Sequence, residues 1–348
     1  MKLIELHILQ SFPVSCLNRD DVGAPKTAVF GGVNRARISS QSLKRAIRMA
    51  ARDGETGEAF QGVRSRLLKQ PFIEALTKHG LADEKKATVK ADEILAVFSK
   101  QDSKKPDQVT TAVFLSPGEI DSIAKAVVEG RKPQDAAKKA VRNDAADIAL
   151  FGRMVANDAT LNVEGAAMFS HALSVHRADN DLDFFSAVDD RKTDAEDAGA
   201  GMIGTLEFTS ALYYRYCAVN LGLLADDHHL AGLSPEQRQA TLDAFIRAVL
   251  TAVPGARKNS MNAHTFPSFV LGVAKDKGQP VQLINAFEEP LSNWDTKQRG
   301  GWEKTAIERL KAHHESLKKT WNVETTAEVS IPESDLNTFC QTLSRHVD

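Results

Sequence analysis

The chain has 348 residues, of which 42% are hydrophobic and 26% charged, with 44 basic and 46 acidic side chains. This composition excludes a disordered chain, a collagen and a disulfide scaffold, and it is typical of one large or two smaller globular domains. No apolar run reaches the roughly 18 to 20 residues of a membrane span, and Met1–Gln10 lacks a signal-peptide pattern. Three distant cysteines predict free thiols in a reducing cytoplasm.

The first part of the chain predicts a strand, a loop, a helix and then a helical insertion. Lys2–Leu9 is typical of a half-buried or buried strand, and turn-forming residues predict a loop from Phe12 onwards. Apolar residues at helical spacing predict a helix over Ser40–Arg52, with Ser39 or Ser40 as its N-cap. Helical patterns then dominate residues 60–150, where Pro133 opens a helix that runs toward Leu150.

The second part of the chain predicts strands followed by helices. Alternation over Ala167–Val175 and Thr205–Val219 indicates two strands, separated by a polar excursion from 179 to 200. Helices are expected over Pro235–Ala252, over Trp302–Thr320 and near Asp335–His346, with a further strand after the first of these helices. This order favours an α+β fold, in which a split βαβ sheet domain carries insertions.

The sharpest local asymmetry of charge lies between Val22 and Arg52. This segment has no acidic residue, although the net charge of the whole chain is -2. Its seven basic residues are Lys26, Arg35, Arg37, Lys44, Arg45, Arg48 and Arg52. A whole-molecule basic field is absent, so a polyanion would have to bind such a local concentration of charge.

The arrangement of these cations predicts a cradle for phosphates. Lys44, Arg48 and Arg52 follow one another at four-residue spacing and share one helix face. The free N–H groups at the start of the helix favour anions, and Gly31-Gly32 would let the backbone approach a ligand closely. The alternative is a solvated basic face whose charges pair with acids from elsewhere in the fold. A cradle of this kind holds a nucleic-acid backbone but does not select a sequence.

The same segment carries a resemblance to a known family. The residues 16–21 (CLNRDD), 30–32 (FGG) and 37–46 (RISSQSLKRA) closely resemble the CasC family, the backbone subunits of the type I-E CRISPR surveillance complex, Cascade. Further matches are 147–150 (DIAL), 152–154 (GRM), 183–185 (DFF), 187–190 (AVDD), 204–205 (GT), 207–208 (EF), 214–216 (YRY), 253–256 (VPGA) and 285–288 (NAFE). The resemblance extends over residues 1 to roughly 260 and is weak beyond Ala256.

The resemblance implies a right-hand shape built on an RRM-like (ferredoxin-like) palm. Residues 1–56 would give the first strand, loop and basic helix of the palm, 57–150 the helical fingers, and 151–179 more of the palm. A β-hairpin thumb would span 180–204, and 205–348 would complete the palm with the C-terminal helices. Several copies would assemble head-to-tail along one CRISPR RNA, as heterologous contacts do in an open filament.

The resemblance also implies which residues contact the guide RNA. The residues that match guide-binding positions are Arg19, Lys26, Ser40, Gln41, Lys44, Arg45, Arg48, Arg153 and Met154. Met154 matches an apolar wedge against the guide bases. Ser186 and Ile203 match the two sides of the thumb, which displaces one base at regular intervals. We expect the guide to pair with target DNA while further Cascade subunits (large, small, guide 5′-end and guide-processing) complete the complex.

Base stacking on sheet aromatics, which RRM domains use, is not expected here. The chain has three tyrosines, Tyr213, Tyr214 and Tyr216, and all lie on one predicted strand, where core and sheet packing is the favoured interpretation. Capture of the backbone suits a subunit that accepts any guide sequence, because it leaves the base edges open for pairing.

No cofactor, metal site or membrane contact is expected, and the favoured interpretation is a non-enzymatic scaffold. The histidines lack a zinc-ligand frame, and Asp179, Asp181 and Asp183 lack the glycine of a calcium loop. One alternative is a metal-dependent ribonuclease of the type III backbone kind that uses Asp20 or Asp21. Turn-forming neighbours favour a structural role for these two carboxylates. A second alternative is a general single-strand binder outside CRISPR defence.

Overall fold

The computed structural model describes residues 1–54, 56–187, 202–227 and 229–347. Its strands are β1 (Leu3–Ser15), β2 (Thr27–Phe30), β3 (Val33–Ile38), β4 (Val63–Ser65), β5 (Val113–Leu115), β6 (Ala167–Phe169), β7 (Ala172–Ser174), β8 (Asp181–Ala187), β9 (Met202–Asn220), β10 (Phe269–Lys275) and β11 (Ala327–Ile331). Its helices are α1 (Ser40–Arg52), α2 (Lys69–Lys78), α3 (Glu84–Phe98), α4 (Pro117–Val128), α5 (Pro133–Lys138), α6 (Ala146–Phe151), α7 (Leu221–Leu224), α8 (Pro235–Thr251), α9 (Asn293–Arg299), α10 (Trp302–Trp321) and α11 (Leu336–Ser344).

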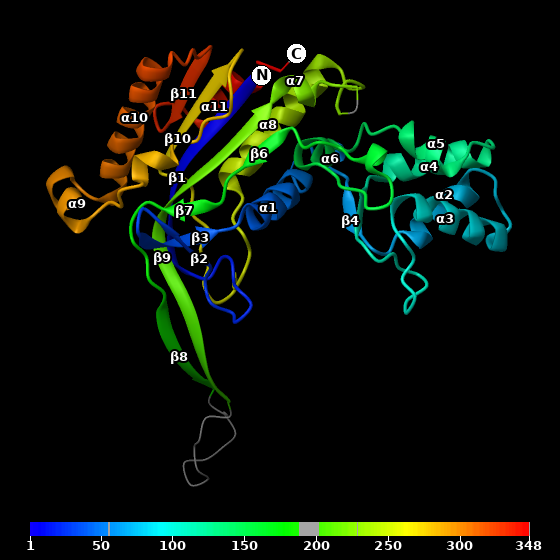
Figure 1. Ribbon diagram of the computed structural model, residues 1–348, viewed down its shortest axis with the longest axis horizontal. Coiled ribbons are helices and arrows are strands. Elements are labelled where there is room, and N and C mark those ends of the chain that lie inside the picture. Colours follow the sequence, from blue (N-terminus) through cyan, green and yellow to red (C-terminus); the bar gives the residue numbers. More distant parts are fainter. Residues whose placement is uncertain (55, 188–201, 228, 348) are drawn as a thin grey trace, which may run out of the picture.

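A large antiparallel sheet forms the body of the molecule (Figure 1). Its strands lie in the order β11-β10-β1-β9-β7-β3-β2, and β6 and β8 also pair with β9. At its centre β1 lies between β9 and β10, and β7 pairs with the other edge of β9. The expectation of an α+β fold with an antiparallel sheet is therefore confirmed.

Strand β1 is buried on both of its faces because helices cover both sides of the sheet. Its side chains Ile4, Leu6 and Ile8 share one core with α1, α8 and α11. Leu9 points to the opposite face, where a second core contains residues of α10. Strand side chains alternate between faces, so one apolar strand anchors both layers.

The face toward α10 also contains a buried polar network. Glu5 forms an ion pair with Lys275 and accepts a hydrogen bond of 2.9 Å from the Tyr216 hydroxyl. His7 Nδ1 lies 2.9 Å from the Tyr214 hydroxyl. All three tyrosines of β9 are buried, which confirms that they pack in the core.

Residues 68–137, together with Val155 and Leu161, form a helical unit with a hydrophobic core of its own, whereas α6 packs in the core of the sheet (Figure 1). Helices α2, α3, α4 and α5 enclose this core, and β4 pairs with β5 at the side nearer the sheet. The helix predicted from Pro133 to Leu150 is in fact broken: α5 ends at Lys138 and α6 begins at Ala146. Between them, Asp144 accepts hydrogen bonds from Ser116 Oγ and Gly118 N at the start of α4.

Strands β8 and β9 form a long ribbon that extends away from the sheet (Figure 1). Ser186 pairs with Ile203 across this ribbon, so the backbones of the two expected wedge residues lie opposite each other. Their side chains, and residues 188–201 of the expected 180–204 hairpin, lie outside the described residues. Leu182 and Phe184, two residues apart on β8, are both largely exposed.

Helices were predicted more accurately than strands. The predictions for α1, α8, α10 and α11 are confirmed to within a few residues. The predicted start of the loop at Phe12 is wrong, because β1 continues to Ser15 through an irregular register after Phe12, whereas residues 16–26 do form a loop. Pro13 fits there because the ladder is interrupted and its missing N–H breaks no regular bond. The hairpin of β2 and β3 was also predicted as loop.

A buried ion pair ties the helical unit to the chain that returns to the sheet. Glu119 of α4 is fully buried and accepts from Arg153 Nη1 at 2.8 and 2.7 Å and from Arg142 Nε at 2.9 Å. Arg153 also donates to the carbonyls of Leu161 and Phe114. Removal of one partner from such a pair leaves an uncompensated buried charge.

We expect Glu119→Ala to lower the free energy of unfolding by about 3–5 kcal/mol, measured from urea denaturation. Glu129→Ala is the matched control, because Glu129 is exposed at the end of the same helix. The control should change the free energy of unfolding by less than about 0.5 kcal/mol. Equal effects of the two substitutions would show that the ion pair contributes nothing to the fold.

Candidate nucleic-acid interface

Helix α1 presents its cations outward because its apolar face is fixed on the sheet. Leu43, Ile47 and Ala51 are buried, and no acidic residue lies in the first turn. Ser39 is the N-cap and its hydroxyl accepts from Ser42 N at 3.3 Å, so of the two predicted caps Ser39 is the right one. With this face buried, Lys44, Arg45 and Arg48 must lie on the remaining sides of the helix.

These three cations line a groove of about 860 Å³ between α1 and the helical unit. The groove is lined by Gln41, Lys44, Arg45, Arg48, Arg64, Thr111, Ala112, Phe114, Phe151, Gly152, Arg153, Met154, Ala156, Val163 and Gly165. Within the described residues, no carboxylate lies within ion-pairing distance of Lys44, Arg45 or Arg48. The groove therefore concentrates uncompensated positive charge, which attracts a polyanion.

Two of the cations rest on aromatic rings. The Lys44 ammonium lies 5.4 Å from the centre of the Phe169 ring, and the Arg48 guanidinium lies 5.0 Å from that of Phe114. A cation over an aromatic face is stabilised without a carboxylate, so its charge stays available. Partial burial lowers the pKa of Arg48, the nearby Asp147 carboxylate opposes this shift, and the charges of its arginine neighbours lower the pKa further. The guanidinium nevertheless stays protonated near pH 7.

Met154 is presented at the groove by the chain around Arg153. Met154 is 84% exposed and lines the groove. Arg153 is buried in the ion pair with Glu119, and its backbone N–H and C=O both bond to Val163 at 2.9 Å. Because its guanidinium points into the protein, the predicted contact of Arg153 with RNA is left to the part of the residue that lines the groove. Arg153 also fixes the segment that carries Met154.

The remaining predicted residues gather at the start of α1, and of these only Gln41 lines the groove. Arg19 is exposed, Lys26 and Ser40 are half-buried, and Gln41 is exposed and also reaches the groove. Asn18 Oδ1 accepts from Ser39 N at 2.8 Å, which ties the loop of Arg19 to the helix. The structure thus places these polar side chains and the groove along one helix.

Asp20 has a structural role in that loop. Its Oδ1 accepts from Val22 N at 3.0 Å and from Ala24 N at 2.9 Å. This Asx-type arrangement confirms the turn that its neighbours predicted. Asp21 is exposed beside it.

Two features of the basic segment do not serve the interface in the predicted way. Gly31 and Gly32 have φ angles of 59° and 75° and form the turn between β2 and β3. A Cβ atom on Gly31 would lie 1.6 Å from the Glu288 carbonyl oxygen, so the close approach is to the protein's own backbone. Arg35 is buried and donates to the carbonyls of Ser174 and Phe287 at 2.8 Å.

Sequence patterns did not indicate Asp147 as part of this site, yet its buried carboxylate lies behind the groove wall. Its Oδ1 accepts from Gly62 N at 3.2 Å and Ile148 N at 3.1 Å, and Oδ2 has no hydrogen-bond partner among the described residues. Burial raises the pKa of Asp147 to about 6, and the nearby Arg48 charge opposes the rise. The absence of a side chain at Gly62 leaves room for the Asp147 carboxylate, because a Cβ atom there would clash with both Asp147 and Phe114.

We expect Asp147→Asn to raise the stability of the fold at pH 8 by up to roughly 3 kcal/mol. The folded-state pKa lies above the ordinary 3.8, so ionisation destabilises the fold as pH rises from about 3.8 through 6. Asparagine keeps the acceptor for the two N–H groups and removes the charge. Urea denaturation should show a large gain at pH 8 and a smaller one at pH 4, with exposed Asp107→Asn as the control. Destabilisation at both pH values would contradict this account.

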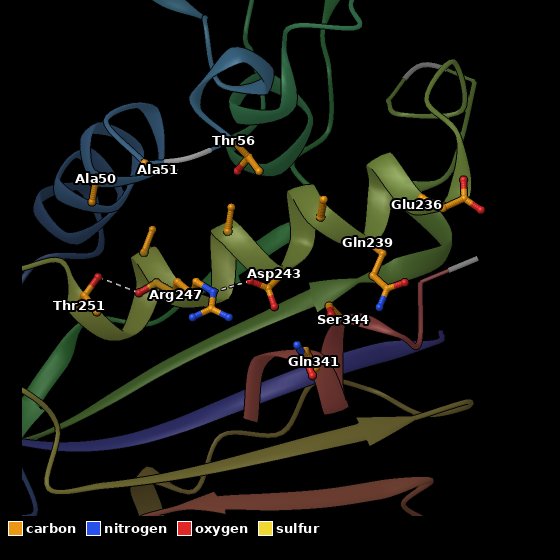
Figure 2. A pocket seen from close by; sticks show the side chains of 14 residues that line it. Ala50, Ala51, Thr56, Glu236, Gln239, Asp243, Arg247, Thr251, Gln341 and Ser344 are labelled. Atoms are coloured by element: carbon orange, nitrogen blue, oxygen red, sulfur yellow. Dashed lines mark hydrogen bonds and ion pairs between the residues drawn. The ribbon is translucent and has the colours of Figure 1, made fainter. Parts of the chain in front are cut away.

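A second hollow, of about 600 Å³, lies beside α1, α8 and α11 (Figure 2). Small side chains such as Ala240 and Ala244 line it together with Glu236, Asp243 and Arg247. Asp243 accepts from Arg247 Nε at 2.5 Å, and Figure 2 shows this pair along α8. With two carboxylates against one guanidinium in its lining, this hollow does not attract a polyanion.

One group of possible metal ligands occurs in the part of the chain that the structure describes. Atoms of His314, Glu315 and Glu328 lie within 4.8 Å of one another. The Lys318 ammonium already lies 3.3 Å from Glu315 and 2.8 Å from Glu328. The group is therefore accounted for as an ion-pair cluster. No helix of the described residues is long and apolar enough to cross a membrane.

The fold and the groove define an α+β protein with a cation-lined face. The chain belongs to the CT1975-like protein family, whose model matches residues 4–345. A chain of the solved "CRISPR RNA-guided surveillance complex, pre-nicking" is 28% identical with a TM-score of 0.78, covering 96% of this chain and 94% of its own. A chain of a "CRISPR RNA-guided surveillance complex" is 25% identical with a TM-score of 0.60, covering 96% and 91%. No curated protein matches the chain.

Proposed function

We propose that this protein is a non-catalytic RNA-binding scaffold, the repeated backbone subunit of a type I-E Cascade that holds CRISPR RNA for pairing with target DNA. The observation that carries the proposal is the groove in which Lys44, Arg45 and Arg48 lie without a carboxylate partner among the described residues. The similarity to chains of two RNA-guided surveillance complexes supports it.

The geometry suits capture of a ribose-phosphate backbone. The ammonium of Lys44 and the guanidinium groups of Arg45 and Arg48 would neutralise consecutive phosphates, which displaces counterions and makes binding sensitive to salt. Phosphate contacts do not depend on the sequence of the guide. The exposed Met154 would pack against bases and interrupt their stack. Base edges left free in this way are available for Watson–Crick pairing.

The topology supports the right-hand architecture within this proposal. The central strands β10-β1-β9-β7 follow the order 4-1-3-2 when numbered along the chain, and α1 and α8 pack on one face. This order supports an RRM-like palm, in which residues 57–150 would be the fingers and the β8–β9 ribbon would belong to the thumb expected over 180–204. Head-to-tail copies of the chain and the other Cascade subunits would complete the assembly.

We expect Lys44→Ala combined with Arg48→Ala to weaken RNA binding roughly a hundredfold, because two charge-assisted contacts are lost. The slope of log affinity against log salt should flatten by about 1.4. Fluorescence anisotropy with single-stranded RNAs of different sequences measures both effects. The matched control is Lys85→Ala with Arg131→Ala, which removes one lysine and one arginine from exposed positions of the helical unit. Losses that depend on the RNA sequence would argue against backbone capture.

The alternative is a metal-dependent ribonuclease that uses Asp20 or Asp21. The two backbone bonds that Asp20 accepts favour a structural role for it, and Asp21 would have to act without it. We expect the protein incubated with RNA and Mg²⁺ to leave the RNA intact on a denaturing gel. Cleavage that disappears in Asp21→Asn and persists in Lys85→Ala would establish the enzyme instead.

A further inference from the structure

His171 lies beside the start of α1 and near the cations Lys26 and Arg37. It occupies the turn between β6 and β7, and its ring is exposed. Its Nδ1 lies 3.0 Å from the backbone nitrogen of Ser40, the first residue of α1. Sequence patterns gave His171 no role, since 131 residues separate it from Ser40 and only the fold brings the two together.

The hydrogen bond to Ser40 determines which nitrogen of the ring carries the proton. A backbone N–H can only donate, so Nδ1 must accept and cannot itself be protonated. A neutral imidazole then has its proton on Nε2. Among the described residues none is hydrogen-bonded to Nε2, so this N–H is a donor that faces solvent.

The surroundings of His171 keep the ring neutral. Partial burial lowers its pKa, and the charges of Arg37 and Lys26 lower it further. Lys26 is one of the residues matched to guide contacts. Arg37, on β3, donates from Nε to Thr27 O of β2 at 3.1 Å. At pH 7 the site therefore combines two cations with a neutral N–H donor.

We propose that His171 is a further RNA-contacting residue, which donates its Nε2–H to the ribose-phosphate backbone at the start of α1. The proposal rests on the proposed function and extends it. Lys26 and Arg37 attract the phosphates to this point, and the imidazole adds a short, directional bond that long flexible cations do not provide. The acceptor is a phosphate oxygen or a ribose 2′-hydroxyl, since both accept from an N–H.

Three substitutions of His171 separate its contact with RNA from its hydrogen bond to Ser40 N. His171→Asn places an amide oxygen near the position of Nδ1, so it keeps the acceptor for Ser40 N and removes the distal donor. His171→Gln places an amide N–H near the position of Nε2, so it restores the donor. His171→Ala removes both groups. The thermal unfolding midpoint of each variant shows whether the hydrogen bond to Ser40 N is kept. Fluorescence anisotropy with a single-stranded RNA, and with the DNA of the same sequence, measures the contact with nucleic acid.

We expect His171→Asn to keep the wild-type unfolding midpoint while binding RNA roughly fivefold more weakly, and His171→Gln to recover most of that loss. A loss for RNA alone identifies the 2′-hydroxyl as the acceptor, whereas equal losses for RNA and DNA identify a phosphate. If His171→Asn bound RNA with the wild-type affinity, the proposal would be overturned, and the role of His171 would be only to accept the hydrogen bond from Ser40 N.

Failure of this inference is distinguishable from failure of the proposed function. If the wild-type protein binds RNA and the Lys44 and Arg48 variant does not, the scaffold function stands whatever His171 does. If the wild-type protein binds no single-stranded RNA at any salt concentration, the proposed function fails and the role of His171 fails with it.

Discussion

The proposed function depends on keeping positive charge away from the protein's own carboxylates. Leu43, Ile47 and Ala51 fix one face of α1 against the sheet, and this packing alone determines where Lys44 and Arg48 point. Aromatic rings support these two cations, neither cation forms an ion pair among the described residues, and the Asp147 carboxylate acts on Arg48 only from behind the groove wall. An ion pair at either position would neutralise the charge that a polyanion needs, so the apolar packing beneath the helix is the condition for the electrostatics above it.

Much of the fold was predictable where its pattern is local. The helix α1 follows from the spacing of its apolar residues and from Ser39, both within a single segment. A strand was expected after the helix at Pro235–Ala252, but its position was not, because β10 is short and buried on both faces and its sequence shows no alternation. The β2–β3 hairpin was missed because Gly31-Gly32 was interpreted as a ligand approach, when the turn itself requires positive φ.

The pattern of charges identified only the cations of the candidate site, and Gln41 and Met154 followed from the resemblance. The run of cations without acids identified Lys44 and Arg48, but charge alone did not distinguish Arg153, which is buried against Glu119. Contributions from distant segments, such as Phe114 beneath Arg48 and His171 at Ser40, depend on tertiary contacts. A sequence lists the ionisable groups, whereas burial determines which of them face solvent.

The β8–β9 ribbon has a consequence for the isolated chain. A pair of strands outside the sheet gains little stability from its own hydrogen bonds. The apolar side chains of Leu182 and Phe184 are exposed to water. We expect the β8–β9 ribbon to be better ordered when another molecule packs against it. We therefore expect the exposed ribbon to lower the solubility of the isolated chain.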